Sequence, residues 1–268
     1  MAEPSPPEWA ALIERSVPHA KLLSPAERAR LEDLLPVFRK EKKFDGANGL
    51  EVTEEMRVSV AAQACMLLIG DPETAVYPDL ASVVMYPAPY VAKTMSRDGL
   101  LVAEGEQARL GESWGAGVVV LAWSAVQQGA SNTEDGHNVV YHEFAHQLDQ
   151  DWGSADGAPE LPEGMQYKTW QHALGKEFHN LEHAADEGRP TLIDHYGATN
   201  AAEFFAVATE TFFEKPIQMR ERKPELYGQL AGYYRQDPAA RVATARAVKA
   251  VAEAATTTKA GKSKRKKK

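Results

Sequence analysis

Two histidines with a glutamate beside the first form the most informative pattern of this sequence, His142-Glu143-Phe144-Ala145-His146. Residues four apart lie one above the other on one face of a helix, so both imidazoles can reach the same metal ion. Glu143 points toward the same side and can hold a water molecule beside that ion. Two ligands and a general base on one helical turn are typical of zinc hydrolases.

The residues around this pattern favour a helix that is anchored in a core. Asn138 is a good N-cap, and Val140, Phe144 and Leu148 form an apolar stripe at four-residue spacing. The sequence therefore predicts a helix from about Val139 to Gln150. The alternative is a buried helix with two hydrogen-bonded histidines and an exposed glutamate, and this context makes it the weaker interpretation.

A second histidine pair competes for the metal. Residues 179–183 read His-Asn-Leu-Glu-His, which is the inverted form of the same motif. The charged and glycine-containing residues that follow, 184–190, look like the end of a surface helix and a loop. A solvated charged face is the better interpretation of this pair.

Catalytic zinc usually takes three protein ligands, so a further donor must lie elsewhere in the chain. Glu203 is the best candidate, because a carboxylate between apolar residues on a mostly buried helix needs a partner. Glu203 also lies three residues after Asn200, so it could instead close a capping box. Glu210 lies on the same face as Glu203 and is either the substitute ligand or an acceptor for a ligand imidazole.

Two more residues have open roles. Tyr196 could donate a hydrogen bond to a developing oxyanion, although spacing alone favours a structural tyrosine with its hydroxyl at the surface. Asp149, one turn after His146, could orient a ligand imidazole, and we slightly favour a solvated position near the helix end.

Several segments, in this order, make the chain similar to a known family: FDGANGL (44–50), AAQAC (61–65), VMYP (84–87), GESW (111–114), QLD (147–149), AEFFAV (202–207), FFEKP (212–216) and PELY (224–227). The chain resembles the Mlc titration factor A family of bacterial zinc-dependent peptidases of the gluzincin type, which is distantly similar to the catalytic domain of anthrax lethal factor. The resemblance extends to about residue 240.

The resemblance implies one Zn²⁺ ion with His142, His146 and Glu203 as ligands, Glu143 as general base and Tyr196 as an aid to transition-state stabilisation. It also implies aminopeptidase-like activity on peptide substrates and binding of a transcriptional repressor of the Mlc type. The alanine-rich C-terminal segment and the lysine-rich tail depart from the family, which weakens the expectation of the repressor partner more than that of the zinc site.

Composition indicates an ordinary soluble protein. The chain has 268 residues, of which 44% are hydrophobic and 25% charged. Its single cysteine, Cys65, lies in an apolar run and reads as a small buried residue, and a chain without an intramolecular disulfide suits the cytoplasm. The N-terminus does not resemble a secretory signal, and no apolar stretch reaches the ~18 residues of a membrane span.

The formal net charge of −8 is unevenly distributed. Residues 257–268 contain seven lysines and arginines and no acidic residue. A disordered, solvated tail is favoured over a nucleic-acid-binding segment, because the tail has no aromatic residue for base stacking. We therefore expect one domain over residues 1–256, with a helical N-terminal part, and a disordered basic tail over 257–268.

The predicted fold class is α+β, with a zincin-like core in which a small mixed sheet lies beside the metal helix and the second ligand helix lies across from it. Strands are expected at 83–86 and 117–123, with short ones near 100–103. A turn is expected at 46–49. Helices are expected within 8–42 and at 53–68, 139–150, 167–186, 200–214, 224–234 and 238–255.

The strand at 117–123 is the candidate edge strand that would bind a substrate backbone by strand addition. Gly115 and Gly117 would let a peptide approach closely, or would simply form the turn into the strand. The loop at 152–164 could border the cleft.

The sequence as a whole indicates metal-assisted hydrolysis of peptide amide bonds. Two other classes stay open. The chain could mainly sequester a transcriptional regulator, or it could hydrolyse non-peptide amides or esters, because the motif determines the metal chemistry and not the substrate.

Overall fold

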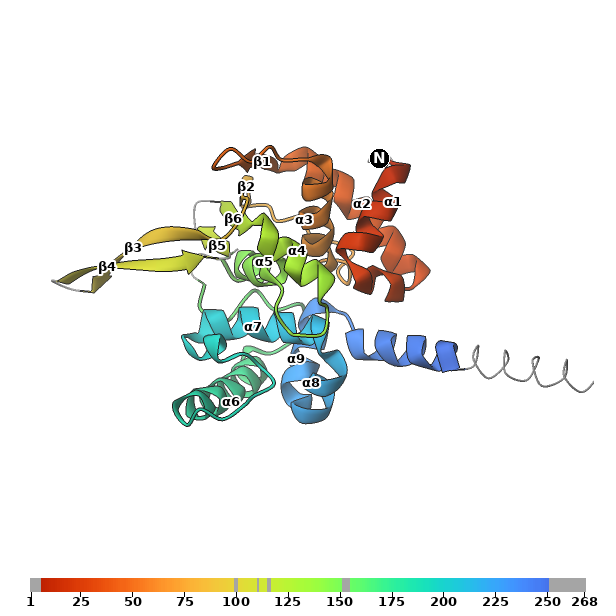
Figure 1. Cartoon of the computed structure of the whole chain (residues 1–268). Helices are drawn as coiled ribbons and strands as arrows, with labels where there is room; N and C mark the ends of the chain where they lie inside the picture. The colour runs from red at the N-terminus through yellow and green to blue at the C-terminus, as the bar shows by residue number, and fades with distance from the viewer. Residues whose placement is uncertain (1–5, 99–100, 110, 115–116, 151–154, 251–268) are drawn as a thin grey trace, which may run out of the picture.

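The computed structural model describes residues 6–98, 101–109, 111–114, 117–150 and 155–250. The predicted basic tail at 257–268 lies outside these ranges. The fold is mostly helical with small sheets, as expected for the α+β class (Figure 1). Within the described ranges, no helix combines the length and apolar content that crossing a bilayer requires.

Helices make up most of the N-terminal part, as predicted. α1 (Pro7–Ser16) is followed by the short 3-10 helix η1 (Pro18–Leu22), α2 (Pro25–Glu41) and α3 (Glu54–Met66). A capping box starts α2, because Ser24 Oγ accepts from the Glu27 N–H at 3.3 Å and Glu27 Oε2 accepts from the Ser24 N–H at 2.8 Å. Thr53 caps α3 through its side chain.

The main sheet has the strand order β1-β2-β6-β5. Its strands are β1 (Lys43–Gly46), β2 (Ser82–Tyr86), β5 (Gly111–Trp114) and β6 (Val118–Ala122). β1, β2 and β6 run parallel, and β5 pairs antiparallel with β6, so the sheet is mixed. Alternate residues of β2, Val83 and Met85, are fully buried, and β6 is buried on both faces from Val119 to Ala122, which ties the sheet to the core.

The predicted edge position of the strand at 117–123 is wrong. β6 pairs with β2 on one side and with β5 on the other, so its backbone has no free hydrogen-bonding edge for a substrate. β5 is the outer strand on this side of the sheet, and it lies against the metal helix α5. Gly117 has a φ of +71°, and a Cβ there would lie 2.4 Å from the Asp79 carbonyl oxygen, so its role is the turn into β6. Gly115 lies outside the described residues.

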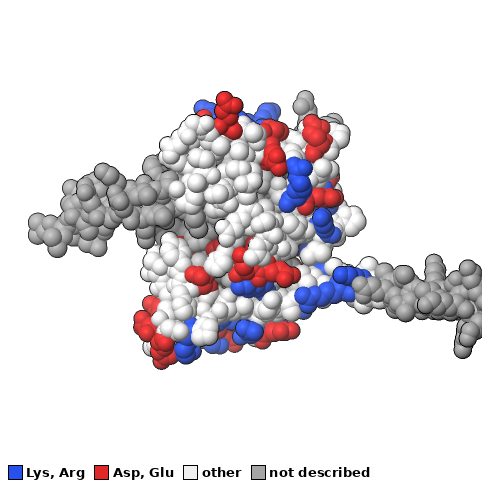
Figure 2. Space-filling model, viewed as in Figure 1, with Lys and Arg blue, Asp and Glu red and all other residues white. Residues whose placement is uncertain are grey.

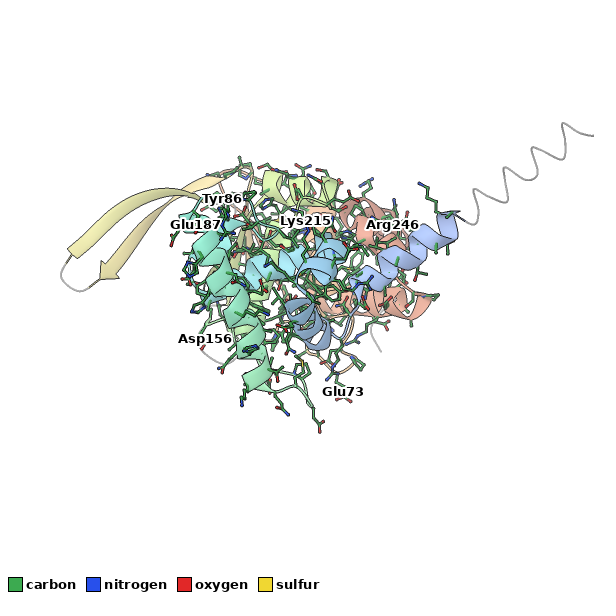
Figure 3. All side chains as sticks on the ribbon, turned by 90° about the horizontal axis from the view of Figure 1, so that it is seen from below. Glu73, Tyr86, Asp156, Glu187, Lys215 and Arg246 are labelled. Atoms are coloured by element: carbon green, nitrogen blue, oxygen red, sulfur yellow. The ribbon has the colours of Figure 1, made fainter. Side chains whose placement is uncertain are left out.

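A long hairpin replaces the short strands expected near 100–103. β3 (Tyr90–Asp98) and β4 (Leu101–Arg109) pair antiparallel along their whole length. Both Figure 1 and Figure 3 show this hairpin extending away from the rest of the molecule. Asp98, the last residue of β3, is followed by Gly99 in the sequence, and an Asp-Gly pair is a strong hairpin signal that the expectation of short strands near 100–103 did not take into account.

The C-terminal half carries the helices that build the site. They are α4 (Trp123–Ser131), α5 (Val139–Gln150), α6 (Tyr167–Asp186), the 3-10 helix η2 (His195–Ala198), α7 (Ala201–Glu214), α8 (Pro216–Arg222) and α9 (Pro224–Tyr234). Residues 238–250 are also helical and extend from the body in Figure 1. α5 packs between α7 and α3, so the two predicted ligand helices are direct neighbours.

An aromatic cluster anchors one face of α5 in the core. The Phe144 ring lies 5.7 Å from that of Phe38 and 4.8 Å from that of Tyr77, and Phe144 is fully buried. Cys65 is also fully buried, and burial raises the pKa of its thiol, as expected for a cysteine that serves only packing. The opposite face of α5, with its histidines, is thereby directed toward α7.

Candidate metal centre

Asn138 starts the metal helix, as predicted. Its Oδ1 atom accepts from the N–H groups of Val140 and Tyr141, both at 3.1 Å. This cap satisfies two N–H groups that would otherwise lack partners at the buried start of α5. With Phe144 buried on the core side, His142 and His146 lie on the side that faces α7.

Glu203 reaches the two histidines from the first turn of α7. Asn200 caps this helix, because its Oδ1 accepts from the Glu203 N–H at 2.9 Å. The Glu203 carboxylate, however, contacts both imidazoles. Glu203 therefore takes the N3 position that the capping alternative required, while its side chain is directed to the histidines.

The donor atoms of these three residues converge on one point. His142 Nε2 lies 3.2 Å from His146 Nε2, and Glu203 Oε2 lies 3.0 Å from the first and 3.3 Å from the second. In a tetrahedral zinc site with bonds of about 2.0–2.1 Å, ligand atoms lie about 3.3–3.4 Å apart. Two imidazoles and one carboxylate are also a donor set that zinc prefers. The three residues thus fit a single divalent ion.

The three groups also shift each other's protonation. Burial disfavours ionised Glu203, but its hydrogen bonds to His142 and His146 outweigh that effect and hold the pKa of this carboxyl well below its usual range. For His142, burial lowers the pKa, and the hydrogen bonds to Glu203 and Glu210 raise it well above the usual value. The cluster therefore favours a positive charge facing an ionised carboxylate.

Glu210 occupies the place of an acceptor behind the ligand imidazole. Its Oε1 lies 2.8 Å from His142 Nδ1, and its Oε2 accepts from the N–H of Asn138. One carboxylate thereby holds both the start of α5 and the ring of its first histidine. A proton on His142 Nδ1, donated to Glu210, leaves the Nε2 lone pair directed at the cluster, which is the tautomer that a metal requires.

Glu143 lies beside the cluster, and its carboxylate is not used in a hydrogen bond to the described residues. The residue is 5% exposed. Burial raises its pKa to about 7, against the opposing effect of His142 and His146. A carboxyl group with a pKa near neutrality is suited to exchange protons with a water molecule or a substrate.

Tyr196 lies closer to the histidines than its spacing alone suggested. Its ring centroid is 5.9 Å from that of His142, and 46% of the residue is exposed. Asp194 holds the backbone here, because its Oδ1 accepts from the Tyr196 N–H at 2.7 Å. The residue is thus at the cluster and accessible from outside.

Asp149 is buried, so the solvated position that we slightly favoured is wrong. Its Oδ2 accepts from the Gly157 N–H at 2.8 Å, and its Oδ1 contacts no hydrogen-bond donor within the described ranges. Burial raises its pKa to about 6. Asp149 therefore anchors the described part of the loop that was expected to border the cleft, and no bond to a histidine is seen.

The second histidine pair does not form a comparable cluster. His179 and His183 are exposed on α6, and His179 Nδ1 lies 2.7 Å from the Gly175 carbonyl of its own helix. Among the described residues, only His142, His146 and Glu203 bring three potential metal-binding groups together. The interpretation of 179–183 as a solvated face is thereby supported.

Glu214 is a buried carboxyl that the sequence analysis missed. It follows Glu210 by one turn of α7, and its Oε2 accepts from the Gly136 N–H at 3.0 Å. Its Oε1 has no partner within the described part of the chain, and burial raises its pKa to about 8. The group therefore stays protonated at neutral pH in the folded protein.

We expect Glu214 to make the protein less stable as the pH rises from about 6 to 8. The unfolded chain loses this proton near its ordinary pKa of about 4.3, whereas the folded protein keeps it to about 8, so rising pH favours unfolding. Glu214→Gln should remove about 2 kcal/mol of this pH dependence. Urea unfolding of the zinc-loaded protein at pH 6 and 8 measures it, with the exposed Glu163→Gln as control. Equal pH dependence in wild type and Glu214→Gln would contradict the assignment.

Comparisons with known proteins agree with the class that this centre defines, a metal-dependent hydrolase with two histidines and a glutamate. Residues 1–235 match the family described as glucose-regulated metallo-peptidase M90, and the chain belongs to this family. It is 40% identical to the uncharacterized protein slr2042 of Synechocystis over 237 residues, which cover 88% of this chain and 86% of that protein.

Two further relatives carry a functional name. Mlc titration factor A of Klebsiella pneumoniae is 33% identical over 233 residues, covering 85% of this chain and 86% of the relative. Mlc titration factor A of Serratia proteamaculans is 32% identical over 228 residues, covering 82% and 86%. The family resemblance inferred from the motifs is thus confirmed.

Proposed function

We propose that this protein is a zinc-dependent peptidase that hydrolyses peptide amide bonds with an activated water molecule. The observation that carries the proposal is the convergence of His142, His146 and Glu203 to within 3.3 Å, with the free carboxylate of Glu143 on the same helix. The membership in a metallopeptidase family supports it. A zincin-like core of the gluzincin type is the matching architecture, with two ligands on one helix and a glutamate on the next.

A zinc ion held by these residues would acidify a water molecule and polarise the scissile carbonyl group. Glu143 takes the proton from the water and passes it to the leaving amine, a role that suits its pKa of about 7. Tyr196 would stabilise the tetrahedral oxyanion with its phenol, a role that its exposed position beside His142 allows. Glu210 fixes the orientation of the His142 ring.

The substrate is an extended peptide, and the activity of the enzyme is aminopeptidase-like. β5 replaces β6 as the strand that pairs with it, because β5 lies at the end of the sheet and against α5. Hydrolysis of non-peptide amides is the alternative, and a panel of peptide and non-peptide amides separates the two.

We expect the purified protein to contain one zinc ion per chain and to lose its peptidase activity when a chelator removes it. The reason is that no group among the described residues other than this cluster can activate water in the same way. Metal analysis combined with an aminopeptidase assay before chelation, after it, and after zinc is restored measures this. Full activity in the metal-free protein would refute the proposal.

A second candidate function is the binding of a transcriptional repressor of the Mlc type, suggested by the name of the relatives. The repressor could be bound by a surface that zinc only shapes. Capture of the repressor by the metal-free variant His142→Ala/His146→Ala would favour this function. A cytoplasmic location fits both candidates. In Figure 2 acidic and basic side chains are interspersed on the visible face, so this face lacks the continuous basic surface that is typical of nucleic-acid binding.

A further inference from the structure

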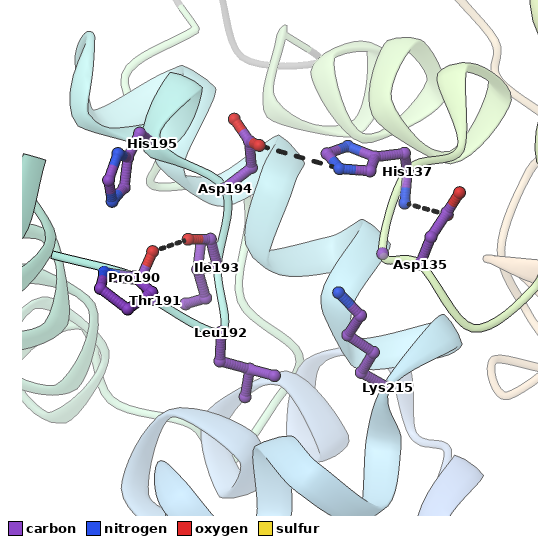
Figure 4. A pocket seen from close by; sticks show the side chains of 10 residues that line it. Asp135, His137, Pro190, Thr191, Leu192, Ile193, Asp194, His195 and Lys215 are labelled. Carbon is purple, nitrogen blue, oxygen red and sulfur yellow. Dashed lines mark hydrogen bonds and ion pairs between the residues drawn. The ribbon is translucent and has the colours of Figure 1, made fainter. Parts of the chain in front are cut away.

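A pocket of about 260 Å³ lies next to the two segments that lead into the metal centre. One wall is residues 135–137, which continue into the N-cap of α5. The other is residues 190–195, which continue into Tyr196. Lys215, at the end of α7, closes the pocket from below in Figure 4.

Lys215 offers an uncompensated positive charge to this pocket. Its side chain is half-buried, and its ammonium group has no ion pair or hydrogen bond with the residues that the structure describes. The neighbouring Glu214 forms no ion pair with it, and the Glu214 carboxyl accepts from the Gly136 N–H instead. Gly136 has a φ of +80°, and a Cβ there would lie 3.0 Å from Lys215 Nζ, so the ammonium passes closely over this glycine. A half-buried ammonium without a counterion favours an anionic ligand.

Asp194 offers a negative charge on the opposite side of the pocket. Its Oδ1 accepts from the Tyr196 N–H, while its Oδ2 lies 3.7 Å from His137 Nε2, which is an ion pair when that imidazole is protonated but is too long for a hydrogen bond. Figure 4 shows Asp194 and Lys215 across the opening from each other, and they form no direct ion pair. Asp135, by contrast, uses both oxygens, for Asn132 Nδ2 and the His137 N–H.

The charged groups and the size of the pocket exclude two simple classes of ligand. A metal ion does not fit, because the acids and imidazoles of the pocket do not converge as those of the metal centre do. A large ligand does not fit either, because pockets for drug-sized molecules measure about 300–1,000 Å³. A small molecule with one negative and one positive end fits both the size and the charges.

We propose that this pocket binds a zwitterion, a free amino acid or dipeptide, with its carboxylate on Lys215 Nζ and its α-ammonium on Asp194 Oδ2. The charge-assisted hydrogen bonds at both ends give affinity and require both free termini. The ligand joins residues 135–137 to residues 190–195 and thereby steadies the Tyr196 segment through Asp194. That the ligand is a product of the same enzyme rests on the proposed function, whereas the binding itself does not.

Calorimetry with dialanine tests the proposal in the zinc-loaded variant Glu143→Gln, which should not consume the peptide. We expect dialanine to bind, and N-acetyl-dialanine and dialanine amide each to bind about 10-fold more weakly or worse, because each loses one charge-assisted contact. Lys215→Gln should bind dialanine and its amide equally. Asp194→Asn should bind dialanine and its acetylated form equally, while its amide oxygen still accepts from the Tyr196 N–H.

The exposed Lys168→Gln is the matched control, because it removes the same charge from α6, away from the pocket. It should bind dialanine as the parent does. Dialanine bound equally well by Lys215→Gln and the parent would overturn the proposal, and so would undiminished binding of the blocked peptides. Peptide hydrolysis is measured separately in the wild type. Failure of the zwitterion-binding proposal would therefore appear in the calorimetry, and failure of the peptidase assignment would appear in the hydrolysis assay.

Discussion

Glu143→Gln should abolish peptide hydrolysis while the protein keeps its zinc. The amide that replaces the carboxylate cannot accept a proton from water, and general bases contribute about 10²–10⁴-fold to catalysis. We expect kcat/KM on an aminopeptidase substrate to fall by at least about 10²-fold. The zinc content should stay at one ion per chain, because Glu143 contributes no atom to the converging donor cluster.

The chain contains a matched control for this variant. Glu182 stands in the other histidine pattern, on α6, where His179 and His183 are exposed and form no cluster. Glu182→Gln should leave both zinc content and activity unchanged. Wild-type activity in zinc-loaded Glu143→Gln would show that another group takes the proton, and loss of zinc from it would show that the residue acts on the metal instead.

The local part of the site could be predicted because its determinants lie within one helix. The N-cap Asn138, the buried Phe144 and the histidine spacing all belong to one segment, and side-chain positions on a helix follow from residue number. The structure places His142 and His146 as this rule requires. Their role as ligands stays a prediction that metal analysis can test.

Glu203 shows where spacing stops being sufficient. Its distance along the chain from the histidines does not determine whether α7 faces α5, so a capping role stayed open beside the favoured metal role. The family motifs resolved this ambiguity, and the structure shows that the backbone of Glu203 is capped while its carboxylate meets the histidines. The two interpretations concerned different atoms of one residue.

The errors concern features that depend on contacts between distant segments. The strand β6 was recognised, but its position inside the sheet depends on pairing with β2 and β5, which periodicity does not reveal. Asp149 looked solvated because it stands near a helix end, yet it is buried and accepts a hydrogen bond from the Gly157 N–H. Glu214 gave no signal at all, since its burial depends on the packing of α7 against the loop at Gly136.

Glu203→Ala should weaken zinc binding more than any other single change on α7. It removes one of three protein ligands, and two imidazoles remain to hold the ion. The helix itself should persist, because Asn200 accepts from the backbone N–H of residue 203, which alanine retains. Zinc stoichiometry after dialysis against a weak chelator and a competition titration of the affinity measure the effect, while circular dichroism confirms the helix content.

Glu210→Gln separates the ligand from its neighbour on the same helix. Glu210 touches the far nitrogen of His142, so its loss should lower zinc affinity by about 10–100-fold, which is the usual effect of an outer partner, while the ion stays bound at high zinc concentration. Glu203→Ala should exceed that range. If Glu203→Ala instead retained full zinc after dialysis and Glu210→Gln lost it, Glu210 would be the third ligand, and α7 would have to turn relative to α5 when the metal binds.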